Sequence, residues 1–203
     1  MNINFNELVK LSNKRNVYMI IGNGTKNQFK NLLSVKAVVK NILKTIEPNS
    51  ILLYFGDKSD KKKPDVGYVY ELISKNRKDI DIILIQINKA KKYGFPSFVK
   101  YLYWHNDFKN DNNKYGGLNN KGEPCSNTKK WISLHKRLKE GIKNVFILSG
   151  GNITLQEYTL IEKYDIPYSY YPLIRKYKGD GNTKIKNNDN IKTKIGQTYK
   201  KIK

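Results

Sequence analysis

The sequence holds a single cysteine, Cys125, and two histidines, His105 and His135. One cysteine cannot form an intramolecular disulfide, so a secreted disulfide scaffold is excluded and a reducing, cytoplasmic setting is expected. The spacing of these three residues fits no Cys/His zinc cluster, and no metal site is expected. No other pattern calls for a bound cofactor, so none is expected.

Long apolar runs are missing as well. Because no stretch of about eighteen apolar residues occurs, we expect no membrane-spanning helix and no membrane partner. The segment Met1–Glu7 lacks a charged start followed by an apolar stretch, so no signal peptide is expected. The chain has 203 residues, of which 38% are hydrophobic, and this size predicts one domain with appendages.

Acidic residues are few beside basic ones, and the formal net charge is +22. The chain is crowded with Asn, Lys, Ile and Tyr, whose codons are rich in A and T. This bias is typical of AT-rich viral or parasite genomes and raises the lysine content without selection for binding. Arginine, which binds phosphate bidentately, occurs only at Arg15, Arg77, Arg137 and Arg175. The charge therefore indicates acidic ligands in general and nucleic acid only weakly.

Four short apolar runs have the length and β-branched content of buried parallel strands. They are Val17–Gly22, Ile51–Gly56, Ile80–Ile87 and Asn144–Gly150, and a weaker fifth follows at Pro167–Tyr171. Helical periodicity lies between them, within 32–43, Gly67–Lys75, Trp131–Lys139 and Thr154–Lys163. An opening helix is expected around Phe5–Leu11, where it would cover an edge of the sheet.

Alternating strands and helices predict an α/β, Rossmann-like three-layer fold with a mainly parallel sheet of about five strands. The domain is expected to span residues 1–174. One interruption, residues 88–128, contains no clear strand and is interpreted as a long insertion or lid. Residues 175–203 alternate Lys, Asn and Thr with isolated Ile, which predicts a flexible basic tail.

Three expected strands end in turns that contain glycine, and the carboxyl ends of parallel strands share one edge of a sheet. Candidate ligand-binding residues therefore follow directly after these strands. They are Gly22, Asn23 and Gly24 after the first strand, Gly56 and Asp57 after the second, and Gly150, Gly151, Asn152 and Thr154 after the fourth.

The turn at Gly150 and Gly151 is the most informative, because two glycines let the backbone approach a ligand closely. The N–H groups of a helix that begins at 152–154 would point into this turn and favour a phosphate. Thr154 can cap that helix or donate its hydroxyl to a phosphate oxygen. Glu157, one turn further, is a candidate catalytic residue, and Asp57 is a second carboxylate at the same edge.

The run GGNITLQE resembles the G-G-x-G-T-x-x-E signature of the LOG-type phosphoribohydrolases, often labelled lysine decarboxylases, within the SLOG group of Rossmann-like nucleotide-binding proteins. The matching positions are Gly150, Gly151, Thr154 and Glu157. Ile153 stands where the family has its third glycine, and Ser149 stands where it has a proline. No match to the family's catalytic arginine is found.

This resemblance implies a nucleotide-type ligand, a homodimer and hydrolysis of an N-glycosidic bond. Thr154 and the amides of 151–153 would hold the 5′-phosphate, and Glu157 would stabilise an oxocarbenium-like ribose or handle a proton of water. Because of the departures from the signature, the resemblance supports nucleotide binding more than hydrolysis.

Other interpretations of the same residues remain open. The chain can instead be a nucleic-acid-binding protein that uses its lysine-rich surface and tail. Glu157 can be a first-turn acid favoured by the helix dipole, and Asp57 can cap a turn. His105, beside Trp104, fits aromatic packing or a loop hydrogen bond better than catalysis, and Asp65 fits a helix start.

Overall fold

The computed structural model of this chain describes residues 1–22, 29, 31–56, 65–107, 116–150, 152–171 and 173. Its six-stranded sheet consists of β1 (Val17–Gly22), β2 (Ile51–Tyr54), β3 (Asp81–Ile87), β4 (Tyr101–His105), β5 (Asn144–Leu148) and β6 (Tyr168–Tyr171). The helices are α1 (Phe5–Ser12), α2 (Leu32–Thr45), α3 (Val66–Asn76), the short 3-10 helix η1 (Asn88–Tyr93), α4 (Ser126–Arg137) and α5 (Asn152–Lys163).

All strands of the sheet run parallel, in the order β4-β3-β2-β1-β5-β6. The chain builds outward from β1 to β4 and then returns to the other side of β1, where Gly22 pairs with Leu148 of β5. This reversal puts the topological switch point of the sheet between β1 and β5. In open α/β sheets, the crevice at such a point is where ligands bind.

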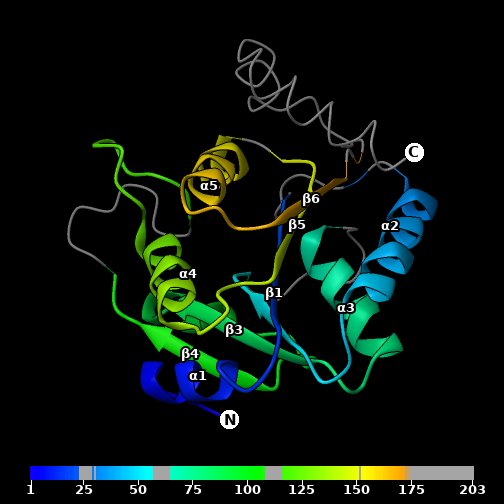
Figure 1. Ribbon diagram of the computed structural model, residues 1–203, viewed down its shortest axis with the longest axis horizontal. Coiled ribbons are helices and arrows are strands. Elements are labelled where there is room, and N and C mark those ends of the chain that lie inside the picture. Colours follow the sequence, from blue (N-terminus) through cyan, green and yellow to red (C-terminus); the bar gives the residue numbers. More distant parts are fainter. Residues whose placement is uncertain are drawn as a thin grey trace.

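Helices cover both faces of the sheet, as Figure 1 shows, with α2 and α3 on one side and α1, α4 and α5 on the other. Successive residues of β1 alternate between the two cores: Tyr18 and Ile20 pack with α2 and α3, whereas Met19 and Ile21 pack with the other three helices. Both faces of each central strand are therefore buried, which explains their nearly continuous apolar sequences.

These observations confirm the predicted three-layer α/β fold with a parallel sheet. The strand count is higher than expected because β4, Tyr101–His105, lies inside residues 88–128, where no strand was predicted. Its sequence, YLYWH, is short and aromatic. The strand joins the sheet by pairing with β3 from Ile83 to Ile87. The tail 175–203 lies outside the described residues.

The amino terminus closes the outer edge of β4. Ile3 donates its N–H to the carbonyl of Leu102, and Leu102 donates to the carbonyl of Met1, both at 2.9 Å. Helix α1 follows, with a capping box formed by Asn4 and Glu7. The helix expected around Phe5–Leu11 is thus confirmed, but it packs on a face of the sheet, and residues 1–3 cover the edge of β4 instead. Among the described helices, none is long and apolar enough to cross a membrane.

Candidate functional site

Two glycines lie at the switch point, one at the end of β1 and one just after β5. Gly22 ends β1 with φ +155°, and a Cβ there would lie 2.4 Å from the carbonyl oxygen of Leu148. Gly150 follows β5 with φ +153°, and its Cβ would lie 2.4 Å from the side chain of Thr154. Both positions require glycine because a side chain would collide with the neighbouring element.

The residue between β5 and Gly150 has an unusual conformation. Ser149 has φ +54°, in the left-handed region that residues other than glycine rarely occupy. Its N–H donates to the carbonyl of Tyr171 at 2.9 Å, so β6 holds the turn in place. Such local strain concentrates at functional sites, and here it adjoins the switch point.

Thr154 joins the start of α5 to the end of β1. Its side chain is 6% exposed, and its hydroxyl donates to the carbonyl of Gly22 at 3.4 Å. The hydroxyl therefore links the start of α5 to the end of β1. The structure thus brings together Gly22, Gly150 and Thr154, three of the predicted site residues.

Glu157 lies one turn beyond Thr154 on the same face of α5 and in a recess walled by protein, although part of its side chain keeps contact with solvent. Loss of hydration in this recess raises the pKa of the carboxyl to about 7. The Thr128 hydroxyl, 3.3 Å from Oε1, and the Gly117 N–H partly oppose this rise. The Trp131 indole N–H faces the same carboxylate without a hydrogen bond of normal geometry.

The wall of this recess comes from the second half of residues 88–128. A Cβ at Gly116 would lie 2.9 Å from Oε1 of Glu157, and one at Gly117 would lie 2.3 Å from Oε1 of Gln156. The N–H of Leu118 donates to Gln156 at 2.9 Å, and that of Gly117 donates to the Thr128 hydroxyl at 2.9 Å. The two glycines therefore let this segment pack directly against the polar face of α5.

Sequence reasoning missed this contact. Gly116-Gly117 is a visible glycine pair, but it stands in a polar stretch whose partner in space is not encoded by any local pattern. The interpretation of 88–128 as a long insertion or lid stays a prediction, and its residues 116–118 pack against α5.

A second polar cluster lies behind the recess, at the ends of β3 and β4. Gln86 accepts hydrogen bonds from the Ile87 N–H at 2.9 Å and from the Asn127 amide at 2.7 Å, and it donates to the Phe55 carbonyl at 2.8 Å. Asn127 in turn faces Nε2 of His105 at 2.8 Å. Gln86, His105 and Asn127 are all buried, so the cluster fixes the start of α4 to the sheet.

His105 belongs to this cluster, and its ring stacks on Tyr103 at 5.7 Å between centroids. Burial lowers the pKa of His105, although contacts with Asn106 and Asn127 oppose the shift. The structure thus confirms aromatic packing and a hydrogen bond as its role. Asp65, interpreted as a helix start, is confirmed as the N-cap of α3, because its Oδ1 accepts from the Tyr68 N–H at 3.0 Å.

Several predicted site residues cannot be placed. Asn23, Gly24, Asp57 and Gly151 lie outside the described residues, so the second carboxylate at this edge stays a prediction. Asn152 begins α5, and Gly56 lies beyond β2, where a Cβ would come within 2.3 Å of the Tyr54 hydroxyl. Within the described part of the chain, no group of three His, Cys, Asp or Glu side chains could hold a metal ion.

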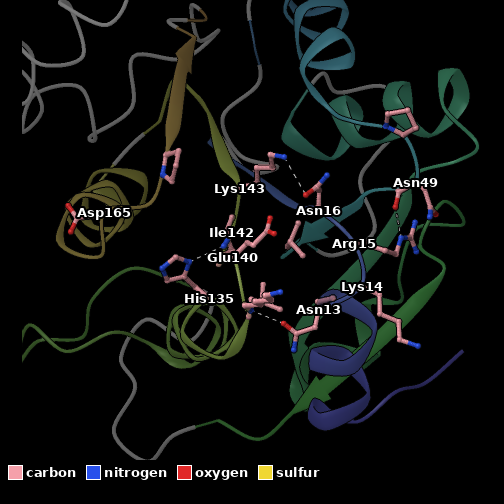
Figure 2. A pocket seen from close by; sticks show the side chains of 17 residues that line it. Asn13, Lys14, Arg15, Asn16, Asn49, His135, Glu140, Ile142, Lys143 and Asp165 are labelled. Carbon is pink, nitrogen blue, oxygen red and sulfur yellow. Dashed lines mark hydrogen bonds between the residues drawn. The ribbon is translucent and has the colours of Figure 1, made fainter.

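A cleft of about 780 Å³ lies at the opposite edge of the sheet, around the amino ends of β1 and β5 (Figure 2). Some of its polar side chains bind one another or the backbone. Arg15 donates to the Asn49 carbonyl at 2.6 Å, and Nδ1 of His135 accepts from the Ile142 N–H at 2.9 Å.

Comparisons of this chain with protein-family models, with curated proteins and with solved structures each give no match. The resemblance to LOG-type phosphoribohydrolases consequently rests on the residues of the Gly150–Glu157 run.

Proposed function

We propose that this chain binds a nucleotide-type ligand at the carboxyl ends of β1 and β5, with the ligand's phosphate at the start of α5. The observation that carries the proposal is the hydrogen bond from Thr154 to the Gly22 carbonyl, because it brings the start of α5 against the end of β1. This contact lies at the switch point, where open α/β sheets bind their ligands.

An anionic ligand group fits this position for two further reasons. The amino end of a twelve-residue helix carries a positive partial charge and unpaired N–H groups, which favour phosphate. The net charge of +22 adds a favourable long-range potential for any anion. A nucleotide combines such a phosphate with a sugar and base large enough to reach towards Glu157.

The proposal is tested by thermal unfolding of the full chain with AMP, GMP, NAD and ADP-ribose, at low and high salt. A ligand present at about a hundred times its Kd adds about 2.7 kcal/mol to the free energy of unfolding. For a chain of this size, that corresponds to a rise in Tm of about 5–10 °C. A rise with at least one nucleotide that persists at high salt is expected.

Two matched variants locate the ligand. Thr154→Val removes the hydroxyl at the switch point, whereas Thr159→Val makes the same change at an exposed position on α5. We expect the nucleotide-dependent rise in Tm to be lost in Thr154→Val and kept in Thr159→Val. No rise with any nucleotide, or an equal rise in both variants, would contradict the proposal.

Hydrolysis of the ligand's N-glycosidic bond is a second candidate function, favoured by the environment of Glu157. A carboxyl whose pKa is about 7 can both accept and donate a proton near neutral pH. In the reaction, the bond from C1′ to the base breaks, the oxygen of water bonds to C1′, and the base leaves with a proton. Glu157 would take the proton from water or stabilise the positive charge on the ribose.

Release of free base, followed by chromatography, tests this second function. Glu157→Gln is expected to keep the nucleotide-dependent rise in Tm while it abolishes base release. If base release is equal in Glu157→Gln, the carboxyl has no catalytic role. If the unsubstituted chain binds a nucleotide and releases no base, the site is a binding site only.

A further inference from the structure

A pair of exposed aromatic rings follows η1. Among the described residues, the large hydrophobic side chains with substantial exposure are Met1, Leu32, Leu33, Tyr93, Phe95 and Ile153. The two rings in this set stand two positions apart in sequence, with Tyr93 49% and Phe95 44% exposed. Single exposed apolar residues need no explanation, whereas two exposed rings close together in sequence are a candidate contact surface for a partner.

A lysine lies over one of these rings, and the lysine before it in sequence lies over the ring of Trp104. Nζ of Lys92 lies 5.0 Å from the centre of the Tyr93 ring, and Nζ of Lys91 lies 5.6 Å from the centre of the Trp104 ring. The salt bridges found among the described residues include neither lysine, whereas nearby Lys89 pairs with Asp107 at 3.0 Å. Lys91 and Lys92 are therefore available to pair with an external anion.

The loop that presents these side chains is anchored at both ends. Ala90 is buried under η1, and the N–H of Gly94 donates to the Lys91 carbonyl at 3.0 Å. Beyond the rings, Phe98 packs partly against the core. The backbone that carries the rings and the lysines is therefore anchored before any ligand arrives, which lowers the entropic cost of binding.

We propose that the surface formed by Lys91, Lys92, Tyr93 and Phe95, here called the η1 platform, binds single-stranded nucleic acid. Exposed rings give each unpaired base a face to stack on, and lysines beside them neutralise the adjoining phosphates. In a duplex, the base faces are hidden, so the rings would contribute nothing there. A solvated charged face alone would explain the lysines and leave the exposed rings unexplained.

The η1 platform is separate from the nucleotide site. It follows β3, and β2 lies between β3 and β1, so the two surfaces share one edge of the sheet at a separation of two strand spacings, about 10 Å. The proposal holds whether or not the switch point binds a mononucleotide, since it names different residues and a different ligand.

Fluorescence anisotropy of labelled oligothymidine and oligouridine with the full chain tests the platform. Tyr93→Ala with Phe95→Ala is expected to weaken binding of both oligonucleotides about tenfold or more, through lost stacking. The control is Leu32→Ala with Leu33→Ala, which removes exposed apolar side chains at the start of α2 and is expected to change binding less than twofold. All four positions are exposed, so the fold should persist, and an unchanged Tm verifies it.

A second pair of variants separates the platform from the general positive charge. Lys91→Gln with Lys92→Gln is expected to reduce the slope of log affinity against log salt by about 1.4. Lys40→Gln with Lys44→Gln, which removes two exposed lysines of α2, is expected to have a smaller effect on affinity.

Three outcomes would overturn the proposal. The first is equal loss of affinity in the two lysine pairs, which would show that only net charge matters. The second is unchanged affinity after removal of both rings. The third is binding to phosphatidylserine vesicles or to duplex DNA with no binding to either single strand.

Discussion

The hydroxyl of Thr128 on α4 donates a hydrogen bond to Oε1 of Glu157 on α5 at 3.3 Å, although 29 positions separate the two residues. The direction of this bond is set by its surroundings. Thr128 already accepts from the Gly117 N–H at 2.9 Å, so its own proton is available for the carboxylate. The hydroxyl thus joins α4, α5 and the segment 116–118 at one point.

Replacement of Thr128 by Val should therefore lower the free energy of unfolding. It removes a hydroxyl that accepts from the Gly117 N–H and donates to the Glu157 carboxylate, and the loss of these two hydrogen bonds costs about 1–3 kcal/mol of unfolding free energy. Thr128→Ser keeps the hydroxyl and should retain most of the stability. Urea unfolding of both variants measures the difference. Equal stability of the Val and Ser variants would show that the hydroxyl is not needed.

Glu157 should make the stability of the protein depend on pH. Because the folded pKa is about 7 and the unfolded pKa about 4.5, the unfolded state loses its proton first as the pH rises. The free energy of unfolding therefore falls between about pH 4.5 and 7, by about 3 kcal/mol at most. Above pH 7 the deficit is constant.

Glu157→Gln removes this titration and is the control. At pH 8 the variant should be more stable than the unsubstituted chain, and near pH 4 the two should agree. Thermal unfolding across this pH range measures both. A difference in stability that is the same at every pH would mean that the carboxyl does not titrate with a raised pKa.

Gly22 and Gly122 form a matched pair for the role of glycine at the switch point. Both have positive φ, at +155° and +75°, but a Cβ at Gly22 would meet the Leu148 carbonyl at 2.4 Å, whereas a Cβ at Gly122 would meet nothing within 4 Å. We expect Gly122→Ala to cost about 1–2 kcal/mol from backbone strain. Gly22→Ala should cost about 3 kcal/mol or more, since β1 or β5 must also shift.

Chemical unfolding of the two glycine variants gives both free energies. If the two substitutions cost the same, close contact between the ends of β1 and β5 is not a constraint. In that case the switch point would be looser than the structure shows.

Substitutions in the buried polar cluster of Gln86, His105 and Asn127 should lower the free energy of unfolding strongly. Gln86→Leu leaves the Phe55 carbonyl, the Ile87 N–H and the Asn127 amide without their partner. A loss of about 3 kcal/mol or more is expected, because several buried polar groups become unpaired at once. Asn88→Ala, at an exposed position next to β3, should cost less than about 0.5 kcal/mol. Similar losses for both would contradict a structural role for the cluster.

Part of this architecture was predictable from local sequence. The apolar runs at Val17–Gly22 and Ile80–Ile87 are long and β-branched enough to indicate buried parallel strands by themselves. The position of Asp65 before an amphipathic stretch indicates a helix start for a local reason, since its side chain caps its own helix. The placement of Gly22, Gly150 and Thr154 at one sheet edge followed from parallel topology alone.

Tertiary structure decided the rest. The strand Tyr101–His105 becomes β4 because it pairs with β3 and is covered by Met1–Ile3, and no short aromatic run specifies such partners. The recess of Glu157 depends on Gly116-Gly117 and Thr128, which come from distant parts of the chain. Periodicity reports which residues are buried, but the pKa of a carboxyl depends on what surrounds it in space. The sequence by itself therefore determined the layers and the edge where a site would lie, and only packing between α4, α5 and residues 116–118 decided the chemistry of Glu157.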